Sequence, residues 1–317
     1  MQTDNAADDP EASYGPTIRH RLIGVLLVLL SGAAIAIVPT SAKLAFEAKA
    51  NTLTVVTLRG VVGLALMALF MAAAGQSFRL PGRTLTPCAT AGLAHAVVAY
   101  GFIGAVAHIP VGLTVLIYAT HPILLAVIFH WQGRERLTPR KLALGFTVLV
   151  ALALVLGARL DELSIAGVAL AALASLAVCG VILLGARAQR GGATSTQVNF
   201  TMIAVATMVC GAATTAGDAW SLPVGVVGWL GLAGAGGGVT IGLVAFFAAF
   251  RFIGPVRATM LSNVEPLLGV LFAVVVLGER LSSLQWIGAA LAVAALALLE
   301  ASPSRRRAPA MPQHEPP

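Results

Sequence analysis

The chain has 317 residues, of which 58% are hydrophobic and only 10% are charged. A soluble domain carries about 25% charged residues, so this composition excludes an ordinary soluble globular protein and favours lipid as the surrounding solvent. The formal net charge of +7 does not indicate a nucleic-acid partner, because the basic residues lie between long apolar stretches.

The chain begins with a polar, acidic segment, residues 1–18, which we expect to be a disordered cytoplasmic tail. The apolar run that follows is too long for the core of a cleaved signal peptide. Apolar stretches near the roughly 20 residues needed to cross a bilayer then recur without period-two alternation, so they predict membrane-spanning helices and argue against a β-barrel. Ten spans are predicted, at residues 22–42, 52–74, 84–107, 111–131, 142–157, 164–184, 198–216, 226–250, 255–277 and 284–301.

The Lys and Arg residues predict the orientation of these spans. With the N-terminus inside, 15 of the 20 basic residues fall on the cytoplasmic side and only four on the outer side. Short cytoplasmic loops carry an excess of Lys and Arg, so both termini are expected in the cytoplasm of a multi-pass plasma-membrane protein of the bacterial inner-membrane type. Residues 302–317, rich in Pro and Arg, are expected to form a disordered cytoplasmic tail.

Two segments match without a gap at a separation of 144 residues, Ile109–Leu137 and Ile253–Leu281. Pro122 aligns with Pro266, and the triplet Glu-Arg-Leu that ends at Leu137 aligns with the one that ends at Leu281. A repeat of five helices is odd-numbered, so its second copy enters the membrane from the opposite side. The sequence therefore predicts two inverted five-helix halves, an arrangement characteristic of secondary transporters.

These two Pro-centred apolar helices with their Glu-Arg-Leu ends, together with Glu265-Pro266, resemble the EamA family of the drug/metabolite transporter superfamily. The resemblance covers roughly residues 22–301 and implies an all-α integral membrane fold with two EamA-like repeats, residues 19–160 and 161–301. It also implies transport of small organic solutes such as metabolites or amino acids, with export favoured. The first copy reads Gly133-Arg134-Glu135 where the second reads Gly278-Glu279.

Ionisable side chains at membrane depth cost about 2.5–3.5 kcal/mol, so each one is a candidate for function. Glu265 is the only carboxylate well inside a predicted span, and it precedes a helix-breaking proline. It is interpreted as a site for a substrate amine or a proton, with local stabilisation of a helix kink as the alternative. His121 is its repeat partner, also followed by a proline, and its alternative is a packed histidine that donates to a neighbouring carbonyl.

Helical spacing puts Thr114 and Tyr118 on the same face as His121, and Ser262 on the same face as Glu265. These residues are predicted to form two related polar stripes at the membrane midplane that contact the substrate. His95 is a weaker candidate for the same role. Arg59 lies eight residues into its span and is interpreted as a structural residue that extends to the outer interface, with attraction of an anionic group as the alternative.

The sequence therefore predicts a secondary transporter that moves a small organic solute by alternating access, with no catalytic residues. No ATPase, metal-ligand or nucleotide motif is found, so no cofactor or metal is expected. Two alternatives remain: an intramembrane enzyme that uses Glu265 with His121 or His95, and a passive facilitator. The residues leave open the solute, the direction of transport, coupling to protons and the oligomeric state.

Overall fold

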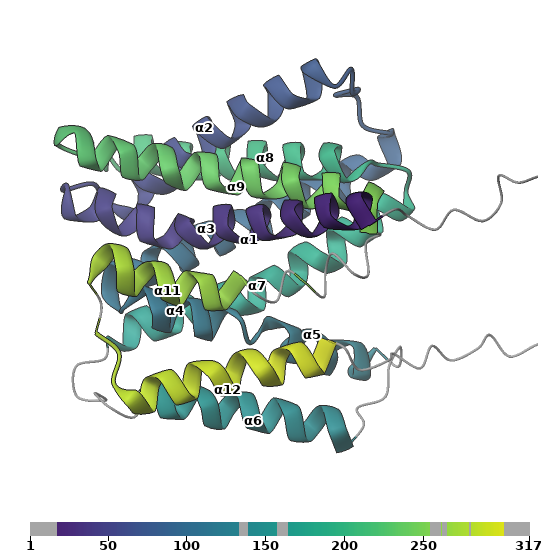
Figure 1. The fold of residues 1–317 in the computed structure, drawn as a ribbon. Coiled ribbons are helices and arrows are strands. Elements are labelled where there is room, and N and C mark those ends of the chain that lie inside the picture. Colours follow the sequence, from purple (N-terminus) through teal and green to yellow (C-terminus); the bar gives the residue numbers. More distant parts are fainter. Residues whose placement is uncertain are drawn as a thin grey trace, which may run out of the picture.

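The computed structural model describes residues 18–132, 139–156, 164–253, 261, 265–278 and 280–300. Within these ranges the chain is helical and contains no β-strand (Figure 1). The elements are α1 (Ile18–Glu47), α2 (Thr52–Ala73), η1 (Gly82–Thr84), α3 (Leu85–His108), α4 (Val111–Tyr118), α5 (His121–Trp131), α6 (Pro139–Leu156), α7 (Ile165–Arg190), α8 (Ser195–Ala216), α9 (Gly225–Ile253), α11 (Glu265–Leu277) and α12 (Ser283–Glu300).

Polar side chains fix the beginnings of three of these helices. The Asn51 side chain accepts a hydrogen bond from the Thr54 backbone N–H at 2.8 Å, and Ser164 caps α7 through the Gly167 N–H. Thr194 and Gln197 form a reciprocal capping box at the start of α8. Because the first N–H groups of a helix lack intrahelical partners, these caps satisfy backbone donors where the chain turns between spans.

Each of the ten predicted spans coincides with helical residues in the described part of the chain. Among the described residues, seven helices qualify as membrane spans by length and hydropathy: Arg21–Glu47, Thr52–Ala73, Gly82–His108, Val111–Trp131, Ile165–Arg190, Ser195–Ala216 and Gly225–Phe246. Two shorter apolar helices follow, Leu268–Leu277 and Ser283–Ala295. The multi-pass helical prediction is therefore confirmed, whereas the count of ten spans stays a prediction.

Packing between the helices has the symmetry expected of a repeat. α1 packs along α9, and α3 packs along α7 in the same way, so the first helix of each half lies on the third helix of the other (Figure 1). α2 packs on its counterpart α8, and α6 packs on its counterpart α12. A shift of 144 residues carries α6 onto α12 without adjustment and α2 onto α8 to within one residue. The internal repeat therefore extends beyond the segments 109–137 and 253–281 to these helices.

Glycines line the contact between α1 and α9. A Cβ added at Gly231 would lie 2.6 Å from the Ser41 carbonyl oxygen, and one added at Gly238 would collide with the Ala34 carbonyl oxygen. Helices in lipid gain little from burying apolar area, so such close backbone approach supplies their packing energy. The repeat-equivalent glycines Gly92 and Gly236 have the same role, the first against Val205 of α8 and the second against Val62 of α2.

The fourth predicted span is interrupted, which the sequence did not predict. α4 ends at Tyr118 and α5 begins at His121. Residue 122 is a proline, which has no N–H to bond the Tyr118 carbonyl four residues earlier. The helix therefore breaks one turn before the proline, and the three residues predicted to share one helical face are divided between two helices.

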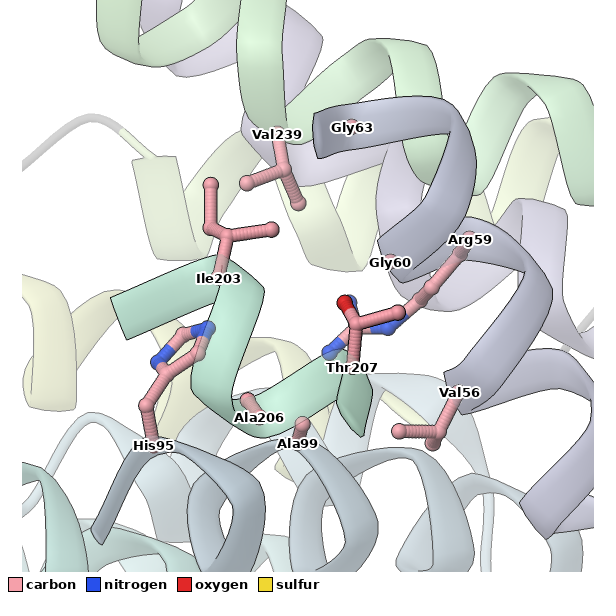
Figure 2. Close-up of a pocket in the computed structure, with 10 residues that line it drawn as sticks. All are labelled: Val56, Arg59, Gly60, Gly63, His95, Ala99, Ile203, Ala206, Thr207 and Val239. Atoms are coloured by element: carbon pink, nitrogen blue, oxygen red, sulfur yellow. The ribbon is translucent and has the colours of Figure 1, made fainter. Parts of the chain in front are cut away.

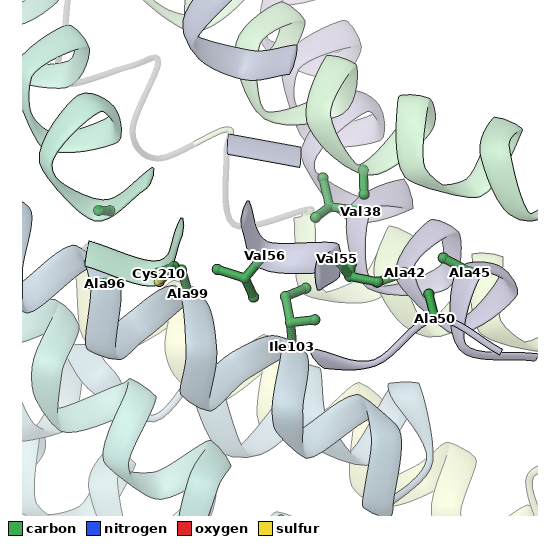
Figure 3. Close-up of a cluster of buried hydrophobic side chains, with 12 residues drawn as sticks. Val38, Ala42, Ala45, Ala50, Val55, Val56, Ala96, Ala99, Ile103 and Cys210 are labelled. Atoms are coloured by element: carbon green, nitrogen blue, oxygen red, sulfur yellow. The ribbon is translucent and has the colours of Figure 1, made fainter. Parts of the chain in front are cut away.

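The buried core beside these contacts consists of small side chains. One cluster joins Val38 and Ala42 of α1 to Val56 of α2 and Ile103 of α3, with Cys210 of α8 at its edge (Figure 3). Cys88, Cys179 and Cys210 are all buried free thiols. This composition lets helices from both halves approach closely around the centre of the molecule.

The glycine contact gives a matched test of stability. Gly237 and Gly238 are neighbours in α9, but a Cβ at Gly237 meets no atom within 4 Å. Replacement by Ala raises helix propensity equally at both positions, by about 1 kcal/mol. We expect Gly238→Ala to be less stable than Gly237→Ala by about 1–3 kcal/mol, the usual cost of overpacking. Unfolding of the two purified variants in detergent, followed by helical circular dichroism during SDS titration, measures this difference. Coincident transitions would contradict the packing described here.

Candidate functional site

A pocket lies where α2, α3, α8 and α9 converge, so both repeats contribute to its wall. The space between its walls, including the part open to the outside, is about 450 Å³. Its lining residues come from near the middle of α3, α8 and α9. They are Val56, Arg59, Gly60, Gly63, His95, Ala99, Ile203, Ala206, Thr207 and Val239 (Figure 2).

Three of these lining residues carry polar side chains: Arg59, His95 and Thr207. In the view of Figure 2 the Arg59 side chain extends toward Thr207, while His95 lies on the other side of α8. No lining residue is acidic. The pocket therefore offers hydrogen-bond donors and one fixed positive charge within an otherwise apolar wall.

The Thr207 hydroxyl is buried and has no hydrogen-bond partner within the described residues. This is unusual for its own helix, because Thr201, Thr214 and Thr215 each donate to the carbonyl four residues earlier. Gly60 of α2 faces this hydroxyl, and a Cβ at position 60 would collide with it. The absence of a side chain at Gly60 thus makes room for a hydroxyl that no described residue hydrogen-bonds.

A second polar cluster surrounds the break between α4 and α5. The Tyr118 carbonyl, left without its helical partner, accepts from the Ser175 hydroxyl of α7 at 3.2 Å and from His121 Nδ1 at 3.0 Å. Thr120 and Ser175 also share a hydrogen bond of 3.0 Å between their hydroxyls, and the Cys179 thiol donates weakly to the His121 carbonyl. Side chains of α7, in the second repeat, therefore satisfy the backbone of a broken helix in the first.

The Tyr118 ring connects this cluster to its surroundings. It packs edge-on against Phe102, with ring centroids 4.8 Å apart, and lies 5.4 Å from the His121 ring. Its phenol lies within electrostatic range of both Arg59 and Glu265.

The structure divides the predicted site residues among these places. His95 lines the pocket, whereas Tyr118 and His121 contact each other at the helix break. Glu265 is the first residue of α11 and is half-buried. Thr114 is fully buried, and its hydroxyl bonds the Pro110 carbonyl at 3.2 Å. Ser262 lies outside the described residues, as do residues 133–138 and Glu279 of the Glu-Arg-Leu motifs.

Two polar residues of the pocket were not among the predicted substrate contacts, Arg59 and Thr207. Arg59 was interpreted as a residue that reaches the interface, yet it lines the pocket. The 144-residue offset held a signal, because it pairs Arg59 with Ile203 and Gly63 with Thr207, in helices that pack on each other. That signal becomes specific only once the folded pocket is known.

Comparison with known proteins bears on the fold and the family. A crystal structure described only as that of a protein superposes with a TM-score of 0.61 at 19% identity, over 89% of this chain and 98% of the other. That likeness shows a shared fold. No curated protein matches the sequence. The model of the EamA-like transporter family matches twice, over residues 22–157 and 165–300. The two matches coincide with the two halves defined by helix packing, and the chain belongs to the EamA-like transporter family.

Proposed function

We propose that the protein is a secondary transporter that moves a small organic solute across the plasma membrane by alternating access, with export as its physiological direction. In this proposal ten membrane helices form two inverted five-helix repeats, and both termini are cytoplasmic. The observation that carries the proposal is the position of the pocket, whose wall is built from equivalent helices of both repeats, α2 with α8 and α3 with α9.

Reciprocal packing of the halves supports movement between two states. Each half places its first helix on the third helix of the other, and the contact between α1 and α9 is lined by glycines. Such a contact has few interlocking side chains, so two arrangements of similar energy are compatible with it. Rocking of inverted repeats about a central site is the general mechanism by which such a fold exposes one site to each side in turn.

The helix break gives the transporter a second element that can respond to solute. Non-helical backbone at membrane depth is tolerated where it is buried in protein or lines a cavity. Tyr118, His121 and Glu265 are therefore proposed to contact the solute together with His95. Contact of Thr114 and Ser262 with the solute stays a prediction from the sequence. Ser175 and Thr120 hold the break in one conformation.

Solute flux tests the proposal directly. Proteoliposomes are loaded with a defined mixture of amino acids and short-chain organic acids, and mass spectrometry identifies which solutes leave faster than from protein-free vesicles. Accumulation of such a solute against its own gradient, driven by an imposed pH or counter-solute gradient, distinguishes a coupled carrier from a passive facilitator. Conversion of a solute into a product would favour an intramembrane enzyme. Vesicles that release nothing faster than the protein-free control would contradict transport.

Glu265→Gln keeps the shape of the side chain and removes its charge. The variant should fold, because a neutral amide costs less to bury than a carboxylate. We expect its flux to fall by roughly tenfold or more, as for loss of a charged hydrogen bond, or its pH dependence to disappear. Glu47→Gln, at the exposed end of α1, is the matched control and should transport normally. Wild-type flux with an unchanged pH profile in Glu265→Gln would make Glu265 a structural residue.

The proposed topology has its own test. The distribution of Lys and Arg favours both termini in the cytoplasm. A reporter fused after Pro317 that is fluorescent only in the cytoplasm should be active, and an alkaline phosphatase fused at the same place, which needs export, should be inactive. The reverse result would require an odd number of spans or an opposite orientation.

A further inference from the structure

The pocket is symmetric in position but not in chemistry. Six of its ten lining residues fall into three pairs separated by the 144-residue repeat offset. Each pair therefore consists of equivalent positions in the two halves, one on either side of the pocket. The pairs are Arg59 with Ile203, Gly63 with Thr207, and His95 with Val239.

Each pair contains one residue with a polar side chain and one that is apolar or glycine. The fold accepts Ile at the position equivalent to Arg59 and Val at the position equivalent to His95, within the same helix packing. Helix packing therefore does not require the guanidinium or the imidazole. Because a cation at membrane depth is costly, its presence on only one side of a symmetric pocket points to a ligand.

Arg59 has no counter-ion in the described part of the chain. No ion pair or hydrogen bond joins it to a described residue, and no carboxylate lines the pocket. The charges within range of Tyr118 are Arg59 itself and Glu265, and Glu265 is not among the pocket residues. A guanidinium is a planar fork that matches the two oxygens of a carboxylate. The pocket therefore lacks the anion that would complete it.

Thr207 adds a second donor at the same place. Its hydroxyl is buried without a partner, although other threonines of α8 bond to their own helix. The rest of the wall is formed by apolar side chains and glycine, among them Val56, Ile203 and Val239. One cation, one hydroxyl and an apolar surface in one pocket match the chemistry of a small molecule with one negative group and an apolar body.

We propose that Arg59 and Thr207 bind the carboxylate group of a small organic acid, whose apolar part packs on Ile203 and Val239. This inference rests on the proposed function, since it names the chemical class of the solute that the same pocket would carry. Arg59 supplies the charge and the forked donor. Thr207 supplies a hydroxyl whose position depends on Gly60, because any side chain there would occupy its space.

Binding to the full-length purified protein tests the proposal without any transport. The probes are straight and branched short-chain carboxylic acids, each compared with its own amide at neutral pH, and the readout is the rise in unfolding temperature with ligand concentration. We expect acids to stabilise the wild type and the isosteric amides to have little effect. Arg59→Ile, which copies the residue at the equivalent position, should fold and should weaken binding of the acid by roughly tenfold to a hundredfold. Arg59→Lys should retain part of the affinity.

Thr207→Val and Thr201→Val form the matched pair of controls. Both remove a hydroxyl from α8, but Thr201 bonds the Gln197 carbonyl and does not line the pocket. Only Thr207→Val should weaken binding of the acids. Equal stabilisation by acids and amides, full affinity in Arg59→Ile, or equal effects of the two threonine variants would overturn the proposal. Acids that bind through Arg59 but are not transported would uphold this inference and contradict the proposed function, and transport of solutes without a carboxylate would do the reverse.

Discussion

The approach of α9 to α1 along a line of glycines is the contact on which the arrangement of the two repeats depends. In lipid each helix already satisfies its own backbone, so hydrogen bonding within helices does not decide which helices pair. Which helices pair is therefore determined where one helix backbone can lie directly against another. Gly238 against the Ala34 carbonyl and Gly231 against the Ser41 carbonyl are such places. They bring a helix of the second repeat against the first helix of the chain.

The rest of the centre follows from this pairing and its symmetric copy. Once α1 lies on α9 and α3 lies on α7, α2 and α8 meet between them and close the wall of the pocket. α7 then runs past the break in the fourth span, where Ser175 takes over the carbonyl that a proline has left unpaired. The break is therefore a property of both repeats, since its sequence cause lies in one half and its stabilisation in the other.

The sequence predicts the helices well, but it predicts much less about the contacts between them. Lipid imposes long apolar helices, so the predicted span 52–74 agrees with α2 to within a residue, and the repeat offset relates α2 to α8 and α6 to α12. The interruption after Tyr118 was not predicted because a proline can either kink a helix or break it, depending on what receives the freed carbonyl. Arg59 shows why the sequence is insufficient here. An arginine within a predicted span has the same sequence pattern whether its side chain reaches the membrane interface or a pocket formed with three other helices. Thr207 was not singled out, because hydroxyls in helices ordinarily bond to their own backbone.

The chemical asymmetry of the pocket has a consequence for how a carrier of this kind would work in its two directions. If both repeats carried the same residues, exchanging their conformations would turn the outward-facing state into a copy of the inward-facing state, and half-saturation would occur at equal solute concentrations on both faces. Arg59 in one repeat and Ile203 at the equivalent position of the other remove that equality, because exchanging the conformations of the repeats would no longer produce the same pocket. Thermodynamics forbids the asymmetry from favouring net movement, which the gradients alone determine. It allows the affinity for solute and the rates of binding and release to differ between the two faces, while the final distribution of solute across the membrane is unchanged.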